Sequence, residues 1–153
     1  MQVRNITQLM SMMKKMYFIL LFLSLVGLAD AGYLTYEYYA KIIPPCTIGS
    51  LFDCGTVIKS SYGYIFNIPV SLWGVVYYSI LSFTDFVFLM HKKRQWIHIF
   101  SIVSVLGFLF SVYFVYVQIF ILKALCFYCM LSAINSFIIF ILIIYIWIKK
   151  ARP

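Results

Sequence analysis

Four long apolar segments, separated by shorter polar ones, make up most of the chain. Each exceeds the roughly 20 residues that an α-helix needs to cross a bilayer. None shows the alternating ten-residue pattern of a membrane β-barrel, and backbone groups inside a bilayer must be hydrogen-bonded within the protein. The pattern predicts an all-α membrane protein, a single domain over residues 1–153 built as a four-helix bundle, with spans at Met16–Tyr39, Pro69–Met90, Trp96–Leu122 and Cys126–Ile148.

The connections between these spans differ greatly in length. Pro69 suits the first position of a helix, and His91–Gln95 is short enough for a tight helical hairpin. The connection over about 40–68 is long, begins near Pro44-Pro45 and carries many apolar residues. Loops of that length in compact proteins are usually functional or disordered. We expect this loop to fold against the membrane and to form a short helix after Cys54.

The composition excludes several classes of protein. Hydrophobic residues make up 65% of the chain and charged residues only 10%, against about 45–50% and about 25% in soluble domains. A soluble enzyme of this size could not bury so much apolar surface, and a disordered chain would be more polar. The net charge of +8 lies in short clusters between apolar segments, which is typical of membrane loops and argues against nucleic-acid binding.

The basic residues predict the orientation of the bundle. Three of the twelve, Lys41, Lys59 and Lys123, fall at the end that carries the long loop. The other nine fall at the opposite end: Arg4, Lys14, Lys15, Lys92, Lys93, Arg94, Lys149, Lys150 and Arg152. Cytoplasmic loops are enriched in Lys and Arg. We therefore expect a multi-pass protein of the cell's inner membrane with both termini in the cytoplasm and the long loop outside.

The first span has an alternative interpretation as a signal peptide. Lys14-Lys15, the apolar run to Leu28 and the sequence Ala29-Asp30-Ala31 resemble its basic, apolar and cleavage regions. The apolar and aromatic character continues to Tyr39, however, which favours a membrane span. Cleavage would leave the orientation of the other three spans unchanged.

Four cysteines form two pairs on the outer side of the predicted bundle. Cys46 and Cys54 lie in the long loop, and Cys126 and Cys129 open the last span. The extracytoplasmic side is oxidising in bacteria, so disulfides persist there. Thiols three residues apart at a helix N-terminus share one face, and the helix dipole favours the thiolate, with Lys123 close by. A thiol of lowered pKa leaves readily in disulfide exchange, so the C-x-x-C pair predicts redox chemistry.

Other uses of the cysteines fit less well. Haem attachment needs a histidine after the second cysteine, where this chain has Met130. A zinc site needs two closely spaced pairs, and Cys46 and Cys54 are too far apart for that, so neither a metal nor haem is expected. A non-catalytic scaffold or transporter subunit with two structural disulfides stays open, and it predicts cysteines that never turn over.

The ordered set of motifs resembles the vitamin K epoxide reductase family. The set comprises Cys46-(x7)-Cys54, then Ser60, then the sequence PVSLWG over Pro69–Gly74, then Cys126-Phe-Tyr-Cys129. The resemblance runs from about Gly27 to Ser136 and is strongest to bacterial members that act as quinone-coupled disulfide oxidases. It implies a four-helix bundle that encloses a quinone and is capped by the long loop.

The resemblance also assigns roles by position. Cys46 would exchange with a reduced partner protein, Cys54 would pass the electrons to Cys126, and Cys129 would attack the quinone. Ser60 matches the active-site serine of the family, and its alternative role is that of a helix cap or turn.

The expected electron acceptor is ubiquinone or menaquinone, with a pocket lined by Trp73, Phe127 and Tyr128. Many members of the family carry a fused thioredoxin-like domain. Because this chain ends at Pro153, we expect a separate DsbA-like or thioredoxin-like extracytoplasmic partner. Asp30 and Glu37, in the outer half of the first span, are candidates to help protonate the quinol oxygens, the alternative being a role in helix packing.

Two departures from the family pattern narrow the expected reaction. The vertebrate enzymes have a quinone-binding asparagine where this chain has Val70, and a tyrosine where it has Ala133. The resemblance therefore supports quinone reduction more than epoxide reduction. Disulfide oxidases of the DsbB type fit poorly because their C-x-x-C lies in the first outer loop. A conduit carrying electrons outward would need cysteines near the cytoplasmic face, and none of the four lies there.

Overall fold

The computed structural model describes residues 2–42 and 53–151, and the side chains of residues 12–42 and 53–149. Within these residues the fold consists of four long helices, α1 (Gln2–Tyr39), α3 (Val70–His91), α4 (Arg94–Tyr116) and α5 (Phe127–Ala151). Helix α4 continues into a π-helical turn, η2 (Val117–Leu122). Four segments are long and apolar enough to cross a membrane, which confirms the predicted spans: Met12–Tyr39, Val70–His91, Arg94–Leu122 and Phe127–Lys149.

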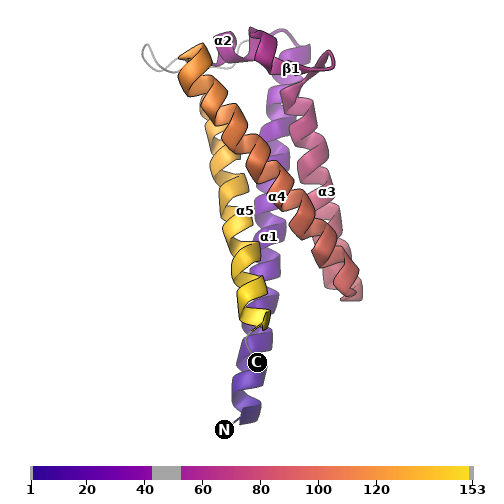
Figure 1. The fold of residues 1–153 in the computed structure, drawn as a ribbon. Helices are drawn as coiled ribbons and strands as arrows, with labels where there is room; N and C mark the ends of the chain where they lie inside the picture. Colours follow the sequence, from indigo (N-terminus) through magenta and orange to yellow (C-terminus); the bar gives the residue numbers. More distant parts are fainter. Residues whose placement is uncertain (1, 43–52, 152–153) are drawn as a thin grey trace.

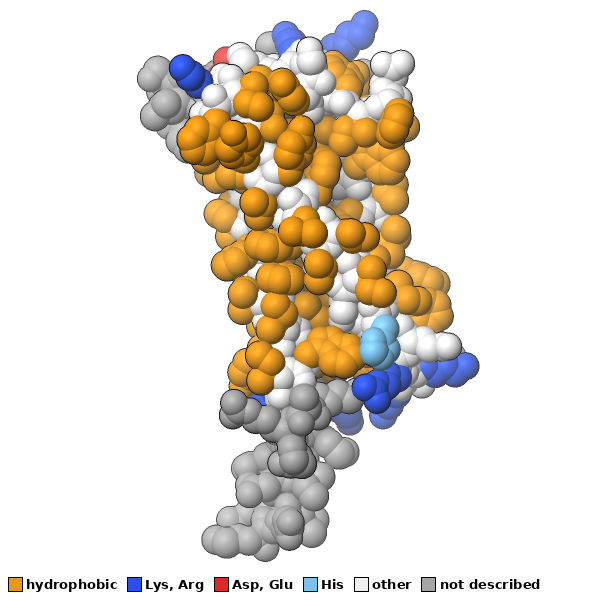
Figure 2. All heavy atoms as spheres, in the orientation of Figure 1, with side chains coloured by type: hydrophobic (Ala, Val, Ile, Leu, Met, Phe, Trp, Pro, Cys, Tyr) orange, Lys and Arg blue, Asp and Glu red, His pale blue; other side chains and the backbone are white. Residues whose placement is uncertain are grey.

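The four helices form a bundle whose two ends differ (Figure 1). Helix α1 packs against α3 and α5, and α4 packs against the same two helices. Both chain termini lie at one end, and the short elements lie at the other, which we call the loop end. Hydrophobic side chains cover the middle of the face drawn in Figure 2, whereas Lys and Arg gather near the ends. This distribution matches a bilayer with polar surfaces on both sides.

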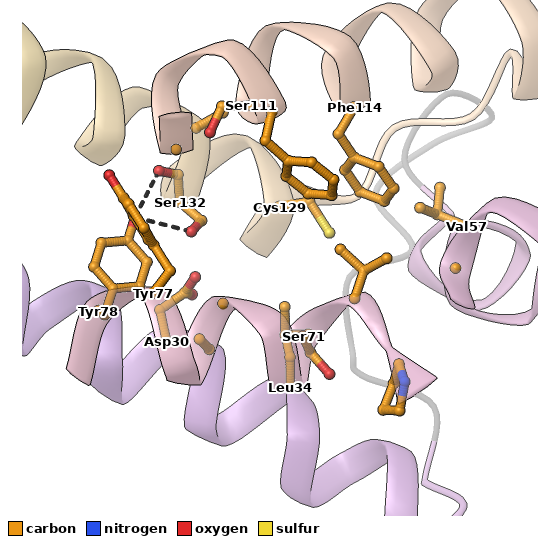
Figure 3. Close-up of a pocket in the computed structure, with 18 of the residues that line it drawn as sticks. Asp30, Leu34, Val57, Ser71, Tyr77, Tyr78, Ser111, Phe114, Cys129 and Ser132 are labelled. Atoms are coloured by element: carbon orange, nitrogen blue, oxygen red, sulfur yellow. Dashed lines mark hydrogen bonds between the residues drawn. The ribbon is translucent and has the colours of Figure 1, made fainter. Parts of the chain in front are cut away.

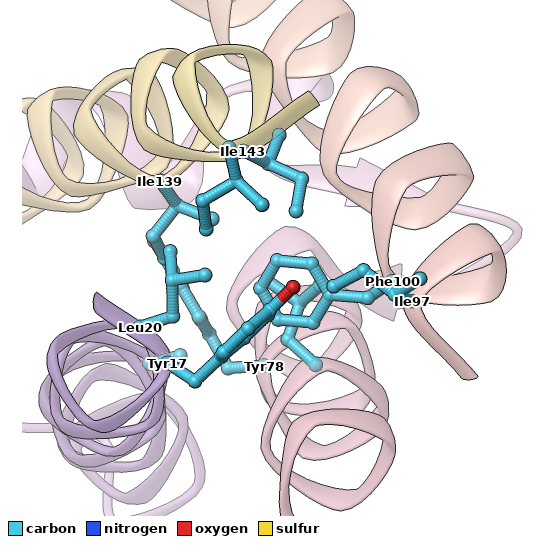
Figure 4. Packing of buried hydrophobic residues seen from close by; sticks show 10 residues of the cluster. Tyr17, Leu20, Tyr78, Ile97, Phe100, Ile139 and Ile143 are labelled. Carbon is cyan, nitrogen blue, oxygen red and sulfur yellow. The ribbon is translucent and has the colours of Figure 1, made fainter. Parts of the chain in front are cut away.

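The core of the bundle is formed by large apolar side chains from all four long helices (Figure 4). Tyr78 is 1% exposed and Phe100 is fully buried. Because lipid is as apolar as these side chains, close packing and hydrogen bonds between helices, more than removal of water, hold such a bundle together. The buried members are Tyr17, Leu20, Ala31, Tyr78, Leu81, Ile97, Phe100, Ile139, Ile143 and Ile146.

The connection between α3 and α4 is the tight hairpin that the sequence predicts. Lys92 takes a left-handed conformation with φ 52°, and its N–H donates to the Phe88 carbonyl over 2.8 Å, which ends α3. Helix α4 begins two residues later at Arg94. At the start of α3 the prediction was slightly wrong, because Pro69 has an extended ψ of 140° and precedes the first helical residue, Val70.

The described part of the long loop contains four short elements. A helix was expected after Cys54, and α2 (Cys54–Lys59) begins at that residue. It is followed by a 3-10 turn, η1 (Ser61–Gly63), and by an antiparallel hairpin, β1 (Tyr64–Ile65) with β2 (Ile68–Pro69). The hairpin turn places Phe66 and Asn67 at φ 54° and 61°. The remaining predictions for this loop, on Pro44-Pro45 and Cys46, concern residues outside the described ones.

A close contact between α1 and α3 depends on a glycine. The Tyr78 hydroxyl donates to the Ser132 carbonyl of α5 over 2.9 Å, so its ring is held in place. A Cβ atom added at Gly27 would overlap that ring, whereas one added at Gly32 would meet nothing within 4 Å. Gly27 therefore lets Tyr78 pass α1 and reach α5.

We predict that Gly27→Ala lowers the stability of the bundle, since overpacking a well-packed core costs about 1–3 kcal/mol. Gly32→Ala is the matched control on the same helix, and it should leave stability unchanged or raise it by up to about 1 kcal/mol because alanine favours helix. The thermal unfolding midpoints of both variants in detergent check this. Equal midpoints would contradict the packing described for Tyr78.

Candidate redox site

Helix α2 is tied to the start of α5 through its first turn. Asp53 caps α2, and its carboxylate accepts hydrogen bonds from the Thr56 N–H at 3.1 Å and the Thr56 hydroxyl at 2.6 Å. These hydrogen bonds hold the pKa of Asp53 below its usual value. The Asp53 N–H donates to the Leu125 carbonyl over 3.0 Å. The residues that precede Cys54 and Cys126 in the chain are thus joined by a backbone hydrogen bond.

This connection brings cysteines that are far apart in the sequence into one buried cluster. Cys54 and Cys126 are both fully buried and belong to a cluster with Val57 and Ala124, against which Cys129 packs. Cys54 is disulfide-bonded, whereas Cys126 and Cys129 are free thiols. Cys46 lies outside the described residues. The described cysteines therefore include one oxidised and two reduced members in the same cluster.

Gln118 in η2 fixes the backbone of the C-x-x-C motif. It is fully buried, and its Oε1 accepts the Cys126 N–H over 2.8 Å. Its main-chain carbonyl accepts the Ala124 N–H over 3.2 Å. Single π-helical turns inside α-helices are frequent at functional sites. The sequence signal for this role is a glutamine within an otherwise apolar span, which does not indicate its partner.

Cys126 is held as a reactive thiol. The Cys129 N–H donates to Cys126 Sγ over 3.3 Å at the start of α5. A hydrogen bond from the Cys129 thiol lowers the pKa of Cys126, helped by the backbone N–H and opposed by burial. Both donors act at a helix N-terminus, where the dipole also favours the thiolate. Cys126 is therefore suited to leave as a thiolate in disulfide exchange.

Beside the cluster lies a cavity of about 370 Å³ between the four long helices. Cys129 forms part of its wall, and Figure 3 shows its side chain together with those of Phe114 and Val57. The other lining residues are mainly apolar or small, with a few polar side chains: Asp30, Ser71, Tyr77, Tyr78, Ser111 and Ser132. Ligand sites of about 300–1,000 Å³ with apolar walls and few polar groups are typical for small molecules. The cavity suits a flat apolar ring such as a quinone.

Among the described side chains, no three His, Cys, Asp or Glu residues are grouped as metal ligands would be. The Ser60 hydroxyl donates to the Val57 carbonyl over 2.7 Å and does not line the cavity. The hydroxyl thus bonds at the end of a helix, as in the structural role considered for Ser60 from the sequence. A contact of this hydroxyl with a quinone or thiolate stays a prediction.

The three aromatic residues expected at the quinone lie elsewhere than on the wall of this cavity. Trp73 and Phe127 are each 41% exposed. Tyr128 packs its ring against Tyr33, with the centroids 5.3 Å apart. On α3 the cavity side is formed instead by Ser71, Gly74 and Tyr77, because Trp73 points from another face of the helix. Direct contact between these aromatic rings and a quinone stays a prediction.

The fold and the site define a multi-pass membrane protein that carries redox-competent cysteines beside an apolar cavity. The model of the vitamin K epoxide reductase family matches residues 18–144. Because the match covers most of the chain, the protein belongs to this family. No curated protein sequence matches the chain. Membership implies a membrane oxidoreductase that couples thiols to quinones.

We predict that removing the Cys129 thiol raises the pKa of Cys126. In Cys129→Ala the side-chain donor is lost, so the ultraviolet absorbance of the Cys126 thiolate should appear only at higher pH than in the wild type. Cys129→Ser is the control, because its hydroxyl still donates, and its titration midpoint should stay close to that of the wild type. Identical midpoints for the wild type and Cys129→Ala would show that this hydrogen bond does not tune Cys126.

Proposed function

We propose that the protein is a disulfide-forming oxidase. It takes electrons from a reduced, extracytoplasmic thioredoxin-fold protein of the DsbA type and passes them to ubiquinone or menaquinone. The observation that carries this proposal is the position of Cys54 and Cys126 in one buried cluster, with Cys129 lining the adjoining cavity. Electron transfer from a soluble protein to a lipid-soluble acceptor needs a first cysteine pair for the protein and a second pair next to the acceptor.

The first step oxidises the partner at the loop end. A thiolate of the partner attacks Cys46 of a Cys46–Cys54 disulfide, and Cys54 leaves as a thiolate. The partner's second thiol then attacks the mixed disulfide, so the partner gains a disulfide and Cys46 becomes a thiol. The disulfide-bonded state of Cys54 supports this step, as does the position of α2 at the loop end (Figure 1).

The second step passes the two electrons inward. The Cys54 thiolate attacks Cys126 of a Cys126–Cys129 disulfide, forming a Cys54–Cys126 bond and releasing Cys129 as a thiolate. Cys46 then attacks Cys54, which re-forms the first disulfide and releases Cys126. The lowered pKa of Cys126 makes it a good leaving group in this second exchange. Common burial of Cys54 and Cys126 supports their contact.

The last step re-oxidises the C-x-x-C pair. A quinone accepts two electrons and two protons, so one Cys126–Cys129 dithiol and one quinone give one disulfide and one quinol. Cys129 faces the cavity and would supply the electron pair to the bound ring. Cys126 would then attack Cys129 to close the disulfide, and the hydrogen bond between them holds the two residues together.

The orientation that this reaction needs agrees with the charge pattern. Nine of the twelve basic residues fall on the side of the chain termini, and both termini lie at the end of the bundle opposite to α2 (Figure 1). By the positive-inside rule the loop end is extracytoplasmic. The protein would then reside in the inner membrane with its cysteines facing the exported partner.

We predict that the purified protein forms quinol anaerobically from a reduced DsbA-like protein and a soluble quinone analogue. Cys129→Ala and Cys46→Ala should each abolish quinol formation with the protein partner. Cys46→Ala should still turn over with a small dithiol, because such a molecule can reduce the second pair directly. Quinol absorbance follows all three reactions.

The scaffold alternative predicts the opposite result. If the wild type reduces no quinone with any dithiol, the oxidase proposal is wrong and the cysteines are structural. Loss of the small-dithiol reaction in Cys46→Ala would contradict the division of roles between the two pairs.

A further inference from the structure

One carboxyl group faces the cavity beside Cys129. Asp30 of α1 lines the cavity, and Figure 3 shows its side chain directed into it between Tyr78 and Leu34. Its Oδ2 is buried and accepts no hydrogen bond from any described residue. Nothing in the three exchange steps uses this group. A buried carboxyl oxygen without a partner, in a cavity beside a reactive thiol, is a candidate for chemistry.

The reaction needs an acid inside the cavity. Quinone reduction consumes two protons at oxygen atoms that the apolar walls would separate from water. The hydroxyl groups of the lining can donate hydrogen bonds, but a tyrosine hydroxyl has a pKa near 10 and serine is weaker still as an acid. Among the described lining residues, Asp30 is the carboxylic acid.

The surroundings of Asp30 favour its proton-carrying form. No Lys, Arg or His is among the described residues that line the cavity. A carboxyl group without a counter-charge in apolar surroundings is stable when neutral, because burial of an unpaired charge is costly. The neighbouring Tyr78 hydroxyl is already engaged with Ser132, at 2.9 Å to its carbonyl and 3.0 Å to its hydroxyl.

We propose that Asp30 is the catalytic acid of the quinone site. The inference rests on the proposed oxidase function. The Asp30 carboxyl donates a proton to a quinone oxygen as the electron pair arrives from Cys129, and the carboxylate then takes up a proton released by the cysteine pair. The same carboxyl passes the second thiol proton to the ring as Cys126 closes the disulfide. Two protons and two electrons thus reach the quinol, and Asp30 is again protonated.

Glu37 provides a matched control within the same helix. It lies seven residues beyond Asp30, is 3% exposed, and its Oε2 is also without a partner among the described residues. It does not line the cavity beside Cys129, which removes the proton-donor role considered for it from the sequence. It borders a separate hollow at the loop end with Tyr38 and Lys41. Substituting Glu37 therefore shows the effect of losing a carboxyl outside the cavity, and substituting Asp30 shows the effect of losing the one inside it.

The experiment compares Asp30→Asn, Asp30→Glu and Glu37→Gln with the wild type. General acids contribute roughly 10²–10⁴-fold to rates, so Asp30→Asn should slow quinol formation by at least about 100-fold. Reduction of its disulfides by the partner in a single turnover without quinone should keep its wild-type rate. Asp30→Glu, which keeps a carboxyl, should recover part of the loss, and Glu37→Gln should match the wild type.

Wild-type quinol formation in Asp30→Asn, with its thiol exchange intact, would overturn the assignment while leaving the oxidase proposal standing. A wild type that reduces no quinone would instead overturn the oxidase proposal itself. Should Asp30→Asn fail to fold, single-turnover quinol formation by the wild type in H₂O and D₂O decides the matter. We expect a slower reaction in D₂O, and equal rates would contradict proton delivery by Asp30.

Discussion

The structure depends on how the chain satisfies its backbone polar groups where it leaves η2 and enters α5. Where water is excluded, an unsatisfied N–H or carbonyl costs several kcal/mol. Gln118 accepts the Cys126 N–H, and the Asp53 N–H donates to the Leu125 carbonyl. The first contact fixes the C-x-x-C motif and the second attaches α2. The same hydrogen bonds that stabilise the connection between η2 and α5 therefore place Cys54 near Cys126.

The cavity results from how α3 packs against its neighbouring helices. Tyr77 and Tyr78 occupy space that Gly107 and Gly27 leave free on the neighbouring helices. Their hydroxyls bond to Ser136 and Ser132 of α5, which holds α3 against α5 at this level. Toward the loop end the helices enclose the cavity beside Cys129. The cysteine at the start of α5 therefore faces an apolar cavity that could hold a flat ring.

The sequence predicted the helices well because the thickness of the bilayer determines their length. The roles assigned to the four cysteines stay predictions. The sequence could not predict which face of each span points inward. In a membrane helix both lipid and core are apolar, so Trp73 looked as suitable for the pocket as its neighbours, yet Ser71 and Gly74 line the cavity. The hairpin was missed because Phe66 rarely takes the left-handed conformation that its turn needs. The mostly apolar sequence of Val117–Leu122 likewise does not distinguish a π-helical turn from the α-helix that precedes it.

The central claim is that Cys54 and Cys126 meet during electron transfer. It is tested most directly in the double variant Cys46→Ala/Cys129→Ala, which retains only these two cysteines. After mild oxidation with a small disulfide, peptide mapping without reduction should find a Cys54–Cys126 bond in most molecules. The variant Cys46→Ala/Cys126→Ala, which retains Cys54 and Cys129, should form the corresponding bond far less. Two free or separately blocked thiols in the first variant would contradict the relay.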